Sequence, residues 1–271
     1  MALVITAIIQ KSHGEALTYA LQAAASASRF EAFKVQLIGK GYVAAVMCAS
    51  LSHEVSSLLL TEAVARSLCN ITSVIPSIEW LVVEANIMVV LHGLNSFGKT
   101  DCTSATMIVY TLRNLAINIK NCMIMCEQGA MRLLAELLEK YSDQSSILGR
   151  LGIYFLQNLG REEKIHDLLI TQNLMELLQV IVFTVSEEKT ESGGEAEARR
   201  VKHPRADLNE IDAFNVVRVI DLVSVSPSCR NAIVSKGAVD LFRALSGYID
   251  DSSRLAMARY IILYLYCAIF N

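Results

Sequence analysis

The residues that could carry out chemistry are thinly spread along this chain. Its five histidines form no His-x-x-x-His or His-Glu-x-x-His pattern. Cys122 and Cys126 are four residues apart and could reach one metal ion, but a zinc site needs two further ligands, which are not found nearby. We therefore interpret both cysteines as core residues and expect neither a metal site nor a cofactor.

One segment invites a nucleotide-binding interpretation. The stretch "GLNSFGKT", residues 93–100, ends in the Gly-Lys-Thr of phosphate-binding loops. Such a loop follows a β-strand, whereas the preceding "IMVVLHGL" has the pattern of a helix in a repeated unit, as argued below. We expect no nucleotide site and, more generally, no catalysis.

A polar motif is written twice. "YTLRNL" starts at Tyr110 and "YFLQNL" at Tyr154, and their asparagines, Asn114 and Asn158, are 44 residues apart. The same step back from Asn114 reaches Asn70 in "SLCNIT". Tyr and Asn four residues apart share one face of a helix, and the leucines between them lie on another face, which predicts that the leucines enter the core.

The motif marks a repeating unit. We expect helices that carry it, or its degenerate forms, to be centred near residues 26, 70, 114, 158, 221 and 264. A second landmark follows each of the first five by 15 or 16 residues, at Gly41, Ala85, Gly129, Asn173 and Gly237, and each precedes an amphipathic run. Each unit is thus predicted to be a short helix, a turn at this landmark, a second helix and a longer third helix.

This unit resembles an armadillo repeat, with "GA-hydrophobic-LL" in the second helix and Leu-x-Asn-Leu in the third. HEAT repeats, which usually have two helices, are the second choice. The resemblance implies an all-α fold, a right-handed superhelix (α-solenoid) of three-helix armadillo repeats. It covers nearly the whole chain as one domain, residues 1–271, and is most specific from Thr61 to Leu178.

The resemblance also implies a binding surface. In armadillo proteins similar to the nuclear-import adaptors, Trp-x-x-x-Asn pairs on the third helices line a concave groove and hold an extended peptide. Here tyrosine replaces that tryptophan and the single tryptophan, Trp80, is in another helix, so a basic import signal is not the expected ligand. The implied partner-binding residues are Arg66, Asn70, Tyr110, Arg113, Asn114, Tyr154, Gln157 and Asn158. An alternative stays open, in which the asparagines only help the repeats to stack.

The regular spacing is broken once. Asn158 and Asp221 are 63 residues apart, and the stretch 186–210 is rich in charge, with a Gly-Gly pair, a proline and almost no large apolar residue. Such a composition buries too little surface to offset its ordering entropy. We interpret 186–210 as an inserted flexible charged loop between a second and a third helix.

Composition narrows the function classes. A net charge of −3 gives no reason to expect nucleic-acid binding. No uncharged apolar run is long enough to span a bilayer, and seven cysteines without a disulfide framework favour a reducing compartment. With no signal peptide recognised, we expect a cytoplasmic protein. An association with the cytoskeleton or a cilium, and a location in the nucleus, stay open as alternatives.

These observations together predict a non-catalytic scaffold or docking subunit of a larger assembly, such as a cytoskeletal or ciliary complex. Its partner would be a protein, as an extended peptide or a helix in the groove, and its apolar ends would join other subunits. The alternative is a soluble adaptor or chaperone cofactor, similar to nucleotide-exchange factors or cargo adaptors.

Overall fold

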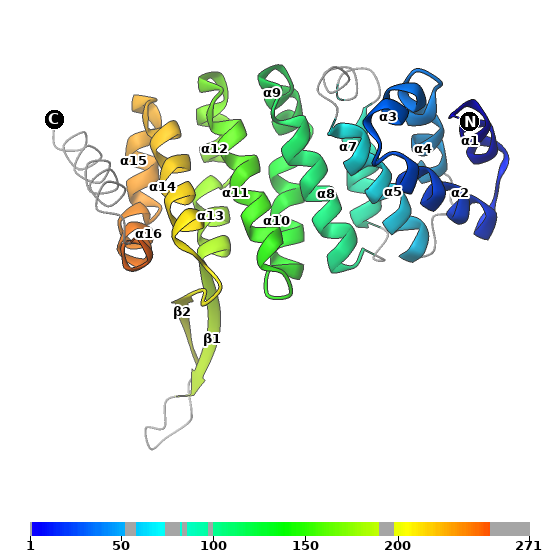
Figure 1. Ribbon diagram of the computed structural model, residues 1–271. Coiled ribbons are helices and arrows are strands. Elements are labelled where there is room, and N and C mark those ends of the chain that lie inside the picture. Colours follow the sequence, from blue (N-terminus) through cyan, green and yellow to red (C-terminus); the bar gives the residue numbers. More distant parts are fainter. Residues whose placement is uncertain are drawn as a thin grey trace. The chain divides into compact units, whose positions relative to one another are not determined.

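A computed structural model describes residues 2–51, 58–73, 82, 86–96, 100–189 and 198–249 of the chain. Contacts divide the chain into two units, Met1–Leu137 and Leu138–Asn271, and Figure 1 shows their helices and one pair of strands. Within the described residues, no helix combines the length and apolarity needed to cross a membrane.

The first unit is helical throughout its described part. Its helices are α1 (Ala2–Lys11), α2 (Gly14–Ala27), α3 (Glu31–Ile38), α4 (Tyr42–Leu51), α5 (Leu58–Thr72), α7 (Ile87–Ser96), α8 (Cys102–Leu115), α9 (Ile119–Glu127) and most of α10 (Ala130–Tyr141). The long helices α2, α5 and α8 are the third helices of successive repeats, and α5 packs against both of the others. Their counterparts α4 and α7, which are second helices, also pack together.

The second unit continues the pattern with one insertion. It contains α11 (Ser146–Gly160), η2 (Glu163–Ile165), α12 (His166–Thr171), α13 (Leu174–Val182), β1 (Phe183–Lys189), β2 (Ala198–Pro204), α14 (Glu210–Ser224), α15 (Pro227–Ser235), α16 (Ala238–Leu245) and η3 (Ser246–Tyr248). The third helices α11 and α14 pack against each other. The third helix expected near residue 264 lies outside the described residues.

Local sequence explains where these helices begin. Asp101 and Asn209 accept hydrogen bonds from the backbone N–H groups of Ser104 and Asp212, at 2.7 and 2.8 Å, and so cap α8 and α14. Before each second helix one residue has a positive φ, a conformation that glycine and asparagine tolerate best. These turn residues are Gly41, Asn86, Gly129, Asn173 and Gly237. In the second repeat the turn therefore lies at Asn86, one residue after the Ala85 that the spacing predicted.

The leucines of the repeated motif form the core, as predicted. Leu112, Leu115, Leu156 and Leu159 are completely buried, and so are the four leucines of α10. Burying one leucine side chain stabilises the fold by about 2 kcal/mol. The apolar positions that set the repeat in the sequence are therefore the positions that hold each unit together.

The insertion differs from its prediction. It lies between the second helix α13 and the third helix α14, as expected, but its described part is an antiparallel hairpin and not an irregular loop. Residues 190–197 lie outside the described residues. The backbone register runs from Phe183 opposite Pro204 to Lys189 opposite Ala198. Composition indicates how much surface a segment can bury, but it carries no information on pairing between two strands.

Candidate partner-binding surface

Two of the predicted asparagines join neighbouring third helices in the first unit. The Nδ2 of Asn70 donates to the carbonyl oxygen of Ala25 at 2.8 Å and to Oγ of Ser28 at 3.1 Å. The Nδ2 of Asn114 makes the corresponding contacts one repeat later, to the carbonyl oxygen of Cys69 at 3.5 Å and Oγ1 of Thr72 at 3.3 Å. The side chains thus form a ladder from α2 through α5 to α8.

This ladder adds a second donor to two carbonyl groups at helix ends, those of Ala25 and Cys69, which also accept from the hydroxyl groups of Ser28 and Thr72. The last four carbonyl groups of an α-helix have no partner within the helix, and Ala25 and Cys69 lie in the last turns of α2 and α5. Asn114 is only 7% exposed, so its amide group is largely removed from water. Among the described residues, neither Oδ1 of Asn70 nor Oδ1 of Asn114 has a hydrogen-bond partner. Each asparagine therefore stacks repeats with its nitrogen and keeps its oxygen as an acceptor.

The other predicted residues of the first unit line up on the same helices. Tyr110 is half-buried on α8, and the guanidinium carbon of Arg113 lies 5.8 Å from the centre of its ring. On α5, Arg66 forms an ion pair with Glu62 one turn earlier. The charge of Arg66 is therefore partly offset within the chain, and the guanidinium of Arg113 lies near an aromatic ring, an arrangement that favours a cation.

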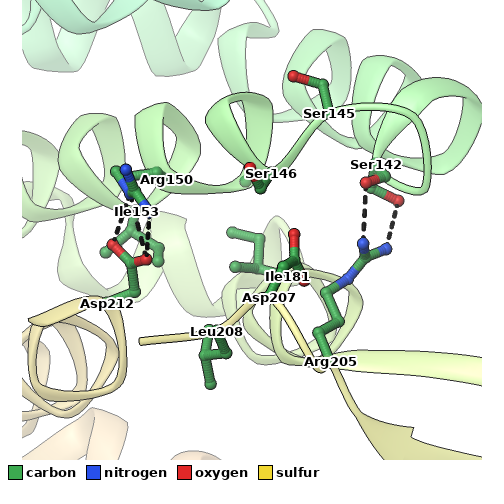
Figure 2. Close-up of a pocket in the computed structure, with 11 residues that line it drawn as sticks. Ser142, Ser145, Ser146, Arg150, Ile153, Ile181, Arg205, Asp207, Leu208 and Asp212 are labelled. Carbon is green, nitrogen blue, oxygen red and sulfur yellow. Dashed lines mark hydrogen bonds and ion pairs between the residues drawn. The ribbon is translucent and has the colours of Figure 1, made fainter. Parts of the chain in front are cut away.

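Polar contacts also join the third helices of the second unit. Gln157 of α11 donates from Nε2 to Oδ1 and the carbonyl oxygen of Asn215, at 2.9 and 3.2 Å. Tyr154 and Asn158 are half-buried on the same helix. Arg150 binds the carboxylate of Asp212 with both Nε and Nη2, at 3.0–3.1 Å (Figure 2). This contact raises the pKa of Arg150 and pairs its positive charge with a carboxylate of the same chain.

Comparison with known proteins identifies the architecture. No family model and no curated protein matches the sequence. Among solved structures, a designed armadillo repeat protein matches with a TM-score of 0.71 at 15% sequence identity, covering 98% of this chain and 100% of that one. Two engineered proteins match with the same TM-score at 14% and 16% identity, each over at least 97% of both chains. The chain has the armadillo-repeat fold.

The armadillo ladder changes its chemistry in the second unit. Its position in α14 is held by Asp221, where α5 and α8 carry asparagine. Asp221 is half-buried, and this burial raises the pKa of its carboxyl group. The positive charge of Arg218 lowers the pKa by a smaller amount. A carboxylate cannot donate a hydrogen bond to the carbonyl groups at the end of the preceding helix, as an asparagine does.

We expect Asp221→Asn to stabilise the second unit by about 1 kcal/mol at neutral pH, through one new hydrogen bond. Because the folded-state pKa of Asp221 is raised, its carboxylate destabilises the fold above that pKa and ceases to do so as pH falls toward the unfolded value. The gain should therefore shrink in acid. Thermal unfolding of both proteins at pH 7 and pH 4 measures this, and an equal gain at both values would contradict the argument.

The structure also reveals a polar centre that the repeat pattern did not indicate. Arg205, directly after β2, is only 8% exposed. Its Nη1 donates to the carbonyl oxygen of Ser142 at 2.8 Å, and its Nη2 donates to Oγ of Ser142 at 2.9 Å and to Oδ1 of Asp143 at 2.7 Å. Arg150 and Arg205 lie on opposite sides of a cavity of about 20 Å³, which has room for about one water molecule (Figure 2). In the sequence, Arg205 is an arginine that directly follows the proline of a charged stretch. An arginine in such a stretch is expected to be an ordinary exposed residue, so the sequence did not indicate its burial.

The motifs considered for chemistry lie on repeat helices where the structure describes them, and residues 97–99 lie outside the described residues. The spacing of "GLNSFGKT" is that of a phosphate-binding loop, but Gly93 lies inside α7 rather than after a strand. Cys122 and Cys126 are both buried in α9, and burial raises the pKa of the Cys126 thiol to about 12. A thiol with such a pKa is protonated at neutral pH and is a poor metal ligand.

Proposed function

We propose that this chain is a non-catalytic scaffold that binds a protein segment along its third helices. The observation that carries the proposal is the repeated Tyr-x-x-x-Asn position. Its tyrosines, Tyr110 and Tyr154, are half-buried on α8 and α11, and Oδ1 of the paired asparagine on α8 has no hydrogen-bond partner in the part of the chain that the structure describes. Repeat proteins commonly use the continuous surface formed by stacked repeats for binding.

The ladder places a condition on the partner. Because the Nδ2 groups of Asn70 and Asn114 are engaged between repeats, these asparagines can offer a ligand only acceptors. A matching segment must supply donors, such as the backbone N–H groups of an extended chain. One such hydrogen bond contributes about 1 kcal/mol, so the tyrosines must supply most of the affinity.

We further propose that the protein is a subunit of a larger assembly, rather than the alternative soluble adaptor. The supporting observation is the exposed apolar side of α1. Val4 is 58% and Ile8 45% exposed, and both line an open hollow in the surface of this helix. Apolar contacts of this kind are typical of subunit interfaces. A concentration-dependent self-association that Val4→Ser and Ile8→Ser abolish would support this role, and a strictly monomeric protein would favour the adaptor.

The binding proposal can be tested without knowing the partner. Peptides selected from a random display library against the purified chain should lose about tenfold or more in affinity for the Tyr110→Ala, Tyr154→Ala double variant, because aromatic side chains dominate such interfaces. Phe30→Ala is the matched control, since Phe30 is 72% exposed at the start of α3, outside the third helices. Selected peptides that bind both variants as tightly as the original protein would refute a third-helix site.

A further inference from the structure

One stripe of α2 is exposed, although the same stripe of α5 is buried. The two third helices match residue for residue at the repeat spacing of 44, since α2 begins at Gly14 and α5 at Leu58. On α2, Tyr19 is 66% exposed, and Ala16 and Ala23 are exposed as well. The equivalent residues of α5 are at most 2% exposed, and they are Leu60, Ala63 and Ser67.

The stripe has the spacing and composition of a helix-packing surface. Its members follow at i, i+3, i+4, i+7 and i+11, which places them along one side of α2. They are Ala16, Tyr19, Ala20, Ala23 and Ala27, and none of them is charged. Alanine offers an extended peptide neither a hydrogen bond nor a deep pocket, whereas it lets a neighbouring helix approach closely. The stripe therefore suits a helix.

The contacts of α5 show what covers this stripe inside the stack. Asn70 follows Ala63 by seven residues, so it lies on the same side of α5, and it reaches back to the carbonyl oxygen of Ala25 on α2 at 2.8 Å. Ser67 accepts a hydrogen bond from the hydroxyl of Tyr42 on α4 at 3.0 Å. The preceding third helix and the second helix of the same repeat thus share the cover. Within the described residues no third helix precedes α2, so its stripe lacks the first of these covers.

The sequence of the chain contains a further segment of the kind that the stripe requires. The repeat order predicts a third helix near residue 264, in the apolar stretch "YIILYLYCAIF" at 260–270, which lies outside the described residues. A third helix has one side for the repeat before it and another for the repeat after it, as α5 has between α2 and α8. We propose that the α2 stripe binds the third helix near residue 264 of a second copy, so that two chains stack as consecutive repeats do.

This inference rests on the proposed role as a subunit of a larger assembly, and it names a second copy as the partner. The two surfaces in such a contact are different, so each bound copy still offers one of them. Contacts of this head-to-tail kind generate rings or open filaments instead of a twofold dimer. We therefore expect association that continues beyond the dimer as the concentration of the chain rises.

The test places a photo-crosslinking amino acid on the stripe of the full chain. Tyr19 is replaced by p-benzoylphenylalanine, which keeps an aromatic ring, and a mixture of isotope-labelled and unlabelled copies is illuminated. We expect crosslinked peptides that join α2 of one copy to residues 250–271 of the other. The same amino acid in place of Phe30, which is 72% exposed at the start of α3, is the control and should give no such crosslink.

Point variants supply a second measurement. Ala23→Glu changes an exposed residue, so the fold should be kept, but it brings an unpaired charge into the contact. Self-association in analytical ultracentrifugation should weaken by at least about tenfold. Gln36→Glu adds the same charge at an exposed site on α3 and should leave self-association unchanged. The Ala23→Glu chain keeps its own segment 250–271, so mixing it with the original chain should shorten the assemblies.

The two proposals fail in different ways. A chain that stays monomeric at every concentration would overturn both the assembly role and this inference. Self-association that depends on Val4 and Ile8 but gives crosslinks between two α2 helices, or to any segment outside 250–271, would keep the assembly role and overturn the stacking. Full self-association of the Ala23→Glu chain would overturn the stacking as well.

Discussion

Arg205→Ala should lower the free energy of unfolding of the second unit by about 3 kcal/mol. The substitution removes three hydrogen bonds. It takes the guanidinium donor away from the carbonyl and hydroxyl groups of Ser142, which is only 8% exposed. Leaving buried polar groups without partners costs about 1–3 kcal/mol, and the space left by the arginine stem adds to this. Equilibrium urea unfolding, followed by hydrogen exchange to resolve the two units, measures the loss.

Two further variants separate the causes of this loss. Arg205→Lys keeps the charge but cannot bind Ser142 and Asp143 at once, so most of the destabilisation should remain. Arg161→Ala removes an exposed arginine just after α11 and should change stability by less than about 0.5 kcal/mol. Hydrogen exchange at the hairpin root should accelerate in Arg205→Ala. If protection of β1 and β2 were unchanged, the anchoring role of Arg205 would be wrong.

Removing both rungs of the first-unit ladder should be about as costly. The double variant Asn70→Ala, Asn114→Ala loses the donors to the carbonyl groups of Ala25 and Cys69. Each rung contributes about 1–1.5 kcal/mol, so the first unit should be destabilised by about 2–3 kcal/mol. The effects should be nearly additive only if the two rungs are independent, which the single variants test in the same urea experiment.

The donor can be isolated from the shape of the side chain. Asn114→Asp keeps the size and the acceptor oxygen but removes the Nδ2 donor, so it should destabilise the unit at neutral pH. Gln36→Ala, which removes an exposed amide from α3, is the control and should have little effect. If the alanine variants retained full stability and lost only peptide binding, the asparagines would act purely as ligand contacts.

The repeat was predictable because two signals agreed at a fixed distance. The Leu-x-Asn-Leu motif marked third helices, and the small or turn-forming landmark marked the start of second helices. Both signals reflect local physics, since leucines at this spacing must be buried and a positive φ selects glycine or asparagine. The difference of one residue arose because a fixed count of 15 residues from Asn70 ends at Ala85. The residue with the positive φ is the next one, Asn86.

The candidate site was less predictable because it depends on partners distant in sequence. Motif spacing placed Tyr110 and Asn114 on one helix face, but it could not show that Nδ2 of Asn114 reaches back to Cys69. Nor could it show that Arg150 would be held by Asp212, 62 residues later and beyond the insertion. Whether Arg66, Asn70, Tyr110, Arg113, Asn114, Tyr154, Gln157 and Asn158 contact a partner remains a prediction.

The hairpin was missed for a related reason. Its stretch has too few apolar residues to form a core of its own, which made an irregular loop the simplest interpretation. Its two strands pair in an antiparallel register, and Arg205 is bound at its base. Register is a property of two segments together, and neither strand alone contains it.

The two ends of this insertion lie close together, and this affects how the length and sequence of the insertion can vary. The carbonyl oxygen of Val182 and the backbone nitrogen of Arg205 are 2.8 Å apart, so the polypeptide departs and returns at almost the same point. A segment of any length inserted between those ends would leave the spacing of α13 and α14 unchanged. Evolution, or a protein engineer, can lengthen, shorten or exchange the arm as a cassette while the helices beneath keep their geometry.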